Sequence, residues 1–239
     1  MKEIEDLSPN FSKKKRAKKN IKFVIIHYTG MQSEIESLKR LKNKNSKVSC
    51  HYFISRGGTV IKMVDESKVA WHAGKSKWKK FKNLNKTSIG IELVNKGHDY
   101  GYEKFSNYQI KNLITLCKRL KRKYNLKSQN FLGHSDIAPL RKVDPGEKFP
   151  WKKLSKFNLG KWYKTHKFKT ETIRQNNVEK IFFKNLSILG YRYFRINLRD
   201  KITDKLIIKA FQRRYNPKRV TGKIDKKTLG ISQYLIKKY

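Results

Sequence analysis

The chain has 239 residues, enough for one medium-sized domain and a second, smaller one. Its two cysteines exclude a disulfide framework, and no run approaches the roughly 20 apolar residues of a membrane span. The 59 lysines and arginines, against 18 aspartates and glutamates, give a formal charge of +41.

This charge favours an anionic partner, and nucleic acid is one candidate. The lysines are spread over the whole chain, however, and no nucleic-acid-binding motif is found. A polyanionic wall polymer or a carboxylate-rich peptide suits such a field equally well, and salt would weaken either association. We therefore expect no specific nucleic-acid partner.

Residues 1–20 are polar and charged, and we expect them to form a flexible N-terminal arm. The basic cluster from Lys13 to Arg16 is not followed by an apolar segment before Phe23, so the pattern does not match a secretory signal. The cytoplasm is the expected location, with the periplasm or cell envelope as the alternative.

The first regular elements follow this arm. Residues 22–27 form a short β-branched run typical of a buried strand, with His27 at its exit. Ser33 and Glu36 form a capping-box pattern that opens a helix to about Leu41.

Residues 48–55 and 59–64 flank Arg56-Gly57-Gly58, which predicts a hairpin with a glycine turn. In its first strand Cys50 and His51 must point to opposite faces, so at most one of them can face a pocket. We expect that residue to be His51, because a cysteine nucleophile would need a base of its own.

Residues 69–84 are irregular, and residues 88–94 predict another strand, in which Glu92 and Gly90 share one face. A carboxylate inside a strand is disfavoured unless it is paired or functional. Residues 106–124 carry a second capping-box pattern and an apolar stripe, which predict a helix against the sheet.

His134 and Asp144 lie ten positions apart in a loop where Pro139, Pro145 and Gly146 argue against a regular helix or strand. Histidine and aspartate are a ligand pair that zinc accepts, and His27 would supply a third ligand. By themselves such residues are more often solvated or turn-capping.

The C-terminal part has a different pattern. Residues 156–174 form a basic connector, and apolar stripes that start at Val178, after Thr203 and after Asp225 predict three helices within residues 175–239.

Five blocks, in this order, resemble the signature of the zinc N-acetylmuramoyl-L-alanine amidases, a family that includes phage-type amidases and peptidoglycan recognition proteins. The blocks are Val24 to Thr29, Cys50 to Gly58, Trp71 to Gly74, Ser88 to Leu93 and Gly133 to Gly146. The resemblance implies an α/β catalytic domain over residues 21–155, with a central mixed sheet flanked by helices. Residues 175–239 resemble, more loosely, a three-helix peptidoglycan-binding domain, with a bland helical appendage as the alternative.

The resemblance also implies roles for single residues. His27, His134 and Asp144 would hold one Zn²⁺ per chain and leave its fourth position open for water. Glu92 would be the general base, and Lys142 would stabilise the oxyanion. Contacts to substrate are implied for His51, Trp71, His72 and Arg141, whereas His98 and His166 match no known role.

The implied reaction is hydrolysis of the amide between N-acetylmuramic acid, or its 1,6-anhydro form, and L-alanine of the stem peptide. It belongs to peptidoglycan turnover or recycling, and the expected partners are peptidoglycan or muropeptide fragments. The alternative is a peptidoglycan-recognition module that binds such fragments without cutting them. Competent side chains at all three ligand positions, and at Glu92 and Lys142, favour the enzyme.

Overall fold

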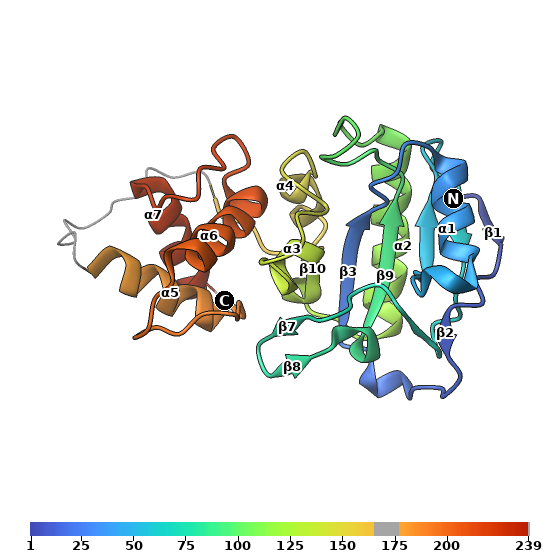
Figure 1. The fold of residues 1–239 in the computed structure, drawn as a ribbon, viewed down its shortest axis with the longest axis horizontal. Coiled ribbons are helices and arrows are strands. Elements are labelled where there is room, and N and C mark those ends of the chain that lie inside the picture. The colour runs from blue at the N-terminus through green and yellow to red at the C-terminus, as the bar shows by residue number, and fades with distance from the viewer. Residues whose placement is uncertain (165–176, 239) are drawn as a thin grey trace.

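The computed structural model describes residues 1–164 and 177–238. Its centre is a six-stranded sheet in the order β1-β5-β4-β9-β3-β10 (Figure 1). In chain order the strands are β1 (Glu3–Glu5), β3 (Phe23–Tyr28), β4 (Tyr52–Ile54), β5 (Val60–Lys62), β9 (Ser88–Leu93) and β10 (Phe131–Gly133). The β4–β5 pair is antiparallel and the other pairs are parallel, which confirms the mixed sheet.

Two short ladders and several helices surround this sheet. The ladders pair β2 (Phe11–Ser12) with β6 (Val69–Ala70), and β7 (Lys77–Trp78) with β8 (Phe81–Lys82). The α-helices are α1 (Glu34–Lys42), α2 (Asn107–Lys123), α3 (His134–Ile137), α4 (Trp151–Ser155), α5 (Val178–Leu189), α6 (Lys201–Tyr215) and α7 (Lys226–Lys238). The 3-10 helices are η1 (Lys18–Asn20), η2 (Lys44–Ser46), η3 (Leu84–Thr87) and η4 (Ser128–Asn130). Within the described residues no helix is both long and apolar enough to cross a bilayer.

The predicted helix starts are confirmed at α1 and α2. Each begins with a capping box. The serine side chain accepts a hydrogen bond from the backbone N–H of the third helical residue, and the side chain of that residue accepts one from the serine backbone N–H. Leu113 and Cys117 of α2 then pack on Val24 and Ile26 of β3, so α2 covers one face of the sheet.

The alternate residues of β3 point to the opposite face of the sheet, where they pack against the C-terminal helices in a second buried cluster. Phe23 and Ile25 belong to one buried cluster with Phe182 of α5 and Phe211 of α6. Figure 1 shows these helices beside the β10 and α3 side of the sheet. The three helices predicted at the C-terminus are confirmed, and they pack on the sheet through shared apolar side chains.

The expected flexible arm is wrong, because residues 1–20 pack against the sheet. β1 pairs with β5 at the sheet edge, and β2 pairs with β6. The Arg16 side chain is only 8% exposed and donates to the backbone carbonyls of Glu66, Asn85 and Ser88. An edge strand obtains its stability from backbone pairing and can keep polar side chains in water, so composition alone did not reveal it.

The remaining expectations differ in outcome. The hairpin is confirmed, with Gly58 at φ +90° where a β-carbon would lie 2.9 Å from Tyr108. Helix α6 begins at Lys201, not after Thr203, because the Asp200 carboxylate accepts from the first free backbone N–H groups. Residues 165–174 of the predicted connector lie outside the described residues.

Candidate metal centre and active site

The candidate site lies where three parallel strands end together. β10, β3 and β9 are neighbours, so their carboxyl ends meet at one edge of the sheet, a common position for ligand sites. His27 of β3 is paired in register with Glu92 of β9, and His134 directly follows β10. Paired residues of neighbouring strands point to the same face, so the topology brings these three side chains together.

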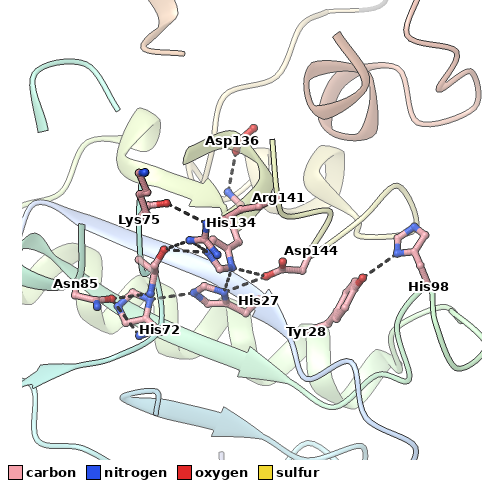
Figure 2. A network of polar contacts seen from close by, with 12 residues as sticks. His27, Tyr28, His72, Lys75, Asn85, His98, His134, Asp136, Arg141 and Asp144 are labelled. Atoms are coloured by element: carbon pink, nitrogen blue, oxygen red, sulfur yellow. Dashed lines mark hydrogen bonds and ion pairs between the residues drawn. The ribbon is translucent and has the colours of Figure 1, made fainter. Parts of the chain in front are cut away.

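Three buried donor atoms converge at this edge. The Nδ1 atoms of His27 and His134 lie 3.0 Å apart, and the Oδ2 atom of Asp144 lies 3.0 Å from the first and 3.1 Å from the second (Figure 2). Tetrahedral ligands about 2.0–2.1 Å from zinc lie roughly 3.3 Å from each other. The two nitrogens and one oxygen therefore fit a divalent metal such as zinc.

Hydrogen bonds on the outer side of each imidazole leave its Nδ1 lone pair facing this point. His134 Nε2 lies 3.2 Å from the carbonyl of Ala73, to which it donates. His27 Nε2 lies 3.0 Å from Nδ1 of His72, and the other nitrogen of His72 lies 3.2 Å from Ser88 Oγ. Ligand histidines are usually oriented in this way, by a hydrogen bond from the ring nitrogen that does not bind the metal.

The charge states also suit a metal. Burial lowers the pKa of His27 to about 4, so its ring is neutral near pH 7. Burial alone would raise the pKa of Asp144, but interactions with His134 and His27 outweigh it and hold that pKa well below the usual range. Neutral imidazoles and an ionised carboxylate are the forms that bind zinc.

Gly90 of β9 makes room for the ring behind His27. A β-carbon on Gly90 would lie 2.3 Å from Cγ of His72, closer than real atoms approach. The backbone N–H groups of His72 and Ala73 both donate to Oδ1 of Asn85, which fixes the segment that carries the ring. Gly90 therefore allows the histidine pair to form.

The loop predicted to lack regular structure contains one short helix. Residues 134–137 form the single turn α3, and Ala138 N–H donates to the carbonyl of His134. Pro139 lies just beyond this turn, where its missing N–H removes no helical hydrogen bond. The proline therefore ends the helix and does not prevent it. The expectation for residues 134–137 is wrong, while Asp144 lies in irregular backbone as expected.

The same turn is fixed by two side chains of the C-terminal part, Tyr191 just after α5 and Arg214 of α6. Together with Asp136 we call them the Asp136 cluster. The Tyr191 hydroxyl donates to Asp136 Oδ1 over 2.6 Å, and Arg214 pairs with Oδ2 of the same carboxylate. A second guanidinium nitrogen of Arg214 donates to the carbonyl of Phe131 in β10. The carboxylate and the guanidinium are 1% and 3% exposed, so this ion pair is buried beside His134.

A cavity of about 450 Å³ opens beside the three donors, and Glu92 and Lys142 both line it. Glu92 Oε2 is shielded from solvent and has no hydrogen-bond partner among the described residues. Burial, and then the negative charge of Asp144, raise the pKa of Glu92 well above its usual range, while Lys142 opposes the shift. An unpaired carboxylate of raised pKa beside a metal site is suited to accept a proton.

Two of the predicted substrate contacts do not lie in this cavity. His51 is fully buried; its Nδ1 accepts from the backbone N–H of Gly90, and its Nε2 lies 2.8 Å from the Arg16 guanidinium. His51 was expected to face the pocket, but its ring is enclosed by protein, and neither His51 nor the equally buried Cys50 lines the cavity. Trp71 does not line the cavity either, and its indole N–H donates to Ser12 Oγ.

The other two predicted contacts line the cavity but are already engaged. Both ring nitrogens of His72 have protein partners, so the expected hydrogen bond to substrate does not fit its position. Arg141 donates from Nε to the carbonyl of Lys75 and from Nη2 to the carbonyl of Ala73, which joins the two loops of the site. It still borders the opening and keeps its predicted role as a candidate carboxylate ligand.

Sequence reasoning missed several residues of the site. Arg40 of α1 lines the cavity. It was missed because it lies outside the five motifs. His98, which had no assigned role, lies 2.9 Å from the Tyr28 hydroxyl (Figure 2). Its other ring nitrogen lies 3.1 Å from the Glu147 carboxylate. It therefore connects the end of β3 to the segment that carries Glu147. His166 lies outside the described residues.

Sequence comparison finds known proteins that are similar to this chain. A family model described as N-acetylmuramoyl-L-alanine amidase matches residues 17–147. The N-acetylmuramoyl-L-alanine amidase AmiD of Escherichia coli is 33% identical over 234 residues, which cover 92% of this chain and 83% of AmiD. The 1,6-anhydro-N-acetylmuramyl-L-alanine amidase AmpD of Enterobacter cloacae is 39% identical over 107 residues, which cover 45% of this chain and 55% of AmpD.

Solved structures give the same result. The complex of E. coli AmiD with anhydro-N-acetylmuramic acid-L-Ala-D-gamma-Glu-L-Lys has a TM-score of 0.82 at 31% identity and covers 92% of this chain and 90% of that one. AmpDh3 of Pseudomonas aeruginosa, in complex with anhydromuramic pentapeptide, has a TM-score of 0.82 at 30% identity and covers 92% and 93%. Matches of this length must include the C-terminal helices. The chain therefore belongs to the N-acetylmuramoyl-L-alanine amidase family.

Proposed function

We propose that this chain is a zinc-dependent amidase that cleaves the bond between N-acetylmuramic acid, or its 1,6-anhydro form, and L-alanine of the stem peptide. One observation supports this most directly. The buried ligand atoms of His27, His134 and Asp144 lie close enough together to bind one metal ion. Glu92, on the neighbouring strand, lines the same cavity, and its Oε2 has no hydrogen-bond partner among the described residues. One Zn²⁺ per chain and muropeptide fragments as partners follow from this proposal.

An amide is a poor electrophile with a poor leaving group, so its hydrolysis needs an activated water, a stabilised oxyanion and a proton for the nitrogen. Bound by His27, His134 and Asp144, zinc would polarise the carbonyl and lower the pKa of water from about 15.7 toward roughly 7. Glu92 would accept the proton of the attacking water and return it to the departing L-alanine nitrogen.

Two cationic side chains of the cavity complete the proposed active site. Lys142 lines the same cavity, and its ammonium group would stabilise the negative charge that develops on the carbonyl oxygen during attack. Arg141, at the rim, would hold a carboxylate of the stem peptide through the part of its guanidinium that faces solvent. The raised pKa of Glu92 makes it a stronger base than an exposed carboxylate once it is ionised.

The test combines metal content with cleavage of a muropeptide. We expect close to one zinc per purified chain and release of free stem peptide from anhydromuramyl-tripeptide. Glu92→Gln should keep its zinc and lose about 100-fold or more in kcat. His134→Ala should lose the metal, and Glu179→Gln, at an exposed position of α5, serves as the matched control.

A zinc-loaded protein that cleaves no muropeptide would overturn the proposal. If that protein still bound muropeptides, it would be a recognition module. Full activity of Glu92→Gln would show that the base is assigned to the wrong residue.

A further inference from the structure

Arg16 is a buried cation that does not line the metal cavity and has no part in the proposed reaction. Within the described residues its guanidinium contacts three backbone carbonyls and one imidazole, and no carboxylate is among these partners. Burial lowers the pKa of Arg16 to about 10, so the group stays charged near pH 7. A buried arginine is usually paired with a carboxylate that offsets its desolvation, so the different partners of Arg16 indicate another role.

The backbone of the N-terminal segment places Arg16 next to the residues that lead to His72. Strand β2 pairs with β6, which ends two residues before His72. Arg16 N–H donates to the carbonyl of Ser67 at 2.7 Å, shortly before β6 begins. Residues 11–16 therefore lie beside residues 67–72 and fix their course.

A first contact of Arg16 leads to the metal ligand His27. Nη1 of Arg16 donates to the carbonyl of Ser88 at 2.7 Å. The hydroxyl of Ser88 lies 3.2 Å from Nε2 of His72, and Nδ1 of His72 lies 3.0 Å from Nε2 of His27. Because these contacts are in series, a shift of Ser88 would tilt the His72 ring, and with it the imidazole of His27.

The same nitrogen of Arg16 leads to the second ligand histidine. Nη1 also donates to the carbonyl of Asn85 at 3.0 Å. Oδ1 of Asn85 accepts from the backbone N–H groups of His72 and Ala73, at 3.1 and 2.6 Å (Figure 2). The carbonyl of Ala73 in turn accepts from Nε2 of His134 at 3.2 Å. One nitrogen therefore holds two backbone positions on which the outer hydrogen bonds of both ligand histidines depend.

Arg16 also fixes His51, a buried imidazole that packs against His72. Nη2 of Arg16 lies 2.8 Å from Nε2 of His51, and Nδ1 of His51 accepts from Gly90 N–H at 3.0 Å. The His51 and His72 rings meet edge to face, with their centres 5.6 Å apart. Gly90 is the residue whose missing β-carbon makes room for His72. Arg16 therefore supports the packing of the His72 ring as well as its hydrogen bonds.

From these contacts we propose that Arg16 is a positioning residue of the metal centre, whose guanidinium holds the groups that orient the imidazoles of His27 and His134. The inference rests on the proposed function, because it takes these two imidazoles as zinc ligands. Arg16 acts only through the residues between, since it does not line the cavity. The N-terminal segment thereby becomes part of the support of the metal centre.

The test uses two variants of Arg16 and one control from the same segment. Arg16→Met removes the guanidinium. Arg16→Lys keeps a positive charge, but its amine ends one bond short of Nη1 and cannot reach all four groups. Asn10→Ala is the matched control, because Asn10 is 2% exposed and its amide donates to the carbonyls of Asn43 and Val48, at 2.8 and 2.9 Å. Neither carbonyl belongs to a residue that supports a ligand histidine.

Three measurements are made on each protein. Competition with a chelator gives the dissociation constant for zinc, the visible absorption spectrum of the cobalt-substituted protein reports ligand geometry, and urea denaturation of the metal-free protein gives stability. Both Arg16 variants should bind zinc about 10–100-fold more weakly, as is usual when the outer support of a metal ligand is lost. Their cobalt spectra should differ from that of the unmodified protein. Asn10→Ala should lose stability and keep both the zinc affinity and the cobalt spectrum.

Unchanged zinc affinity and cobalt spectra in the Arg16 variants would overturn the proposal. Equal weakening of zinc binding by Asn10→Ala would also overturn it, because any loosening of the N-terminal segment would then have the same effect. Complete recovery in Arg16→Lys would assign the effect to charge alone and refute the role of the guanidinium contacts. If Arg16→Met does not fold, the comparison of Arg16→Lys with Asn10→Ala decides the question.

The outcome is distinguishable from failure of the amidase proposal, because none of these measurements requires cleavage of a substrate. Unmodified protein that binds no zinc would refute the metal site, and this inference with it. Unmodified protein that binds zinc, with Arg16 variants that bind it equally well, would refute only the role of Arg16.

Discussion

The buried ion pair between Arg214 and Asp136 predicts that the C-terminal helices control the metal centre. Helix α3 is a single turn that begins with His134, and Asp136 fixes this turn through bonds to Gly133 N–H, Tyr191 and Arg214. We consider Arg214→Met, which keeps an unbranched side chain of similar length and removes the charge. The change leaves the Asp136 carboxylate buried without its cation.

The expected magnitude follows from the burial of both partners. Removing one member of a buried ion pair typically costs about 3–5 kcal/mol, because the other charge is left uncompensated. For a chain of about 150–250 residues each kcal/mol lowers Tm by roughly 2–4 °C, so Tm should fall by about 6–20 °C. Asp136→Asn in the Arg214→Met background should restore part of the loss, since it removes the unpaired charge.

Two measurements should be made on the same samples. Urea denaturation gives the free energy of unfolding, and competition with a chelator gives the dissociation constant for zinc. The visible absorption spectrum of the cobalt-substituted protein would report a change in ligand geometry that a general loss of stability would not produce. We expect Arg214→Met to bind zinc about 10–100-fold more weakly, as is usual when support of a ligand is lost.

Arg199→Met is the matched control, because it removes an arginine–aspartate pair that lies wholly within the C-terminal part. The side chains of Arg199 and Asp204 are 20% and 12% exposed, against 3% and 1% for Arg214 and Asp136, so a smaller loss of stability is expected, with unchanged zinc affinity. If Arg214→Met lost less than about 1 kcal/mol, the buried-pair reasoning would be refuted. A large loss of stability with normal zinc affinity and an unchanged cobalt spectrum would refute the link to the metal centre.

Three further predictions concern the metal site itself. Gly90→Ala should displace His72, whose Cγ would lie 2.3 Å from the new β-carbon, and should cost about 1–3 kcal/mol and weaken zinc binding; unaltered stability and affinity would contradict this. The free energy of unfolding of the metal-free protein should decrease as pH falls from about 6.5 to about 4, by on the order of 3 kcal/mol from His27 alone. The reason is that the unfolded chain binds more protons than the folded one in this range. Urea denaturation across the range tests whether stability falls with pH. Chelation of the metal should lower Tm, by an amount corresponding to about 4 kcal/mol if free zinc had been at 1,000 times its dissociation constant, while Tm of His134→Ala should not respond to zinc.

The N-terminal residues and His51 show where sequence reasoning was insufficient. Residues 1–20 are polar, and only the pairing of β1 with β5 shows that their backbone extends the sheet. Strand alternation indicated only that Cys50 and His51 point in opposite directions, and both side chains are buried. Whether an inward side chain meets a cavity or a neighbouring arginine depends on what packs above it, which here is Arg16 from the distant N-terminal segment.

The sequence by itself indicated strands β3, β4, β5 and β9 and the two capped helices, because periodicity and capping patterns are encoded by neighbouring residues. The family resemblance of its ordered motifs implied the three converging side chains. Tertiary structure alone decided how His27 is supported by His72, and how Asp136 is held by Arg214 from 78 residues away. Such contacts depend on the relative placement of elements far apart in the chain, which is set by packing of the shared core and leaves no local pattern.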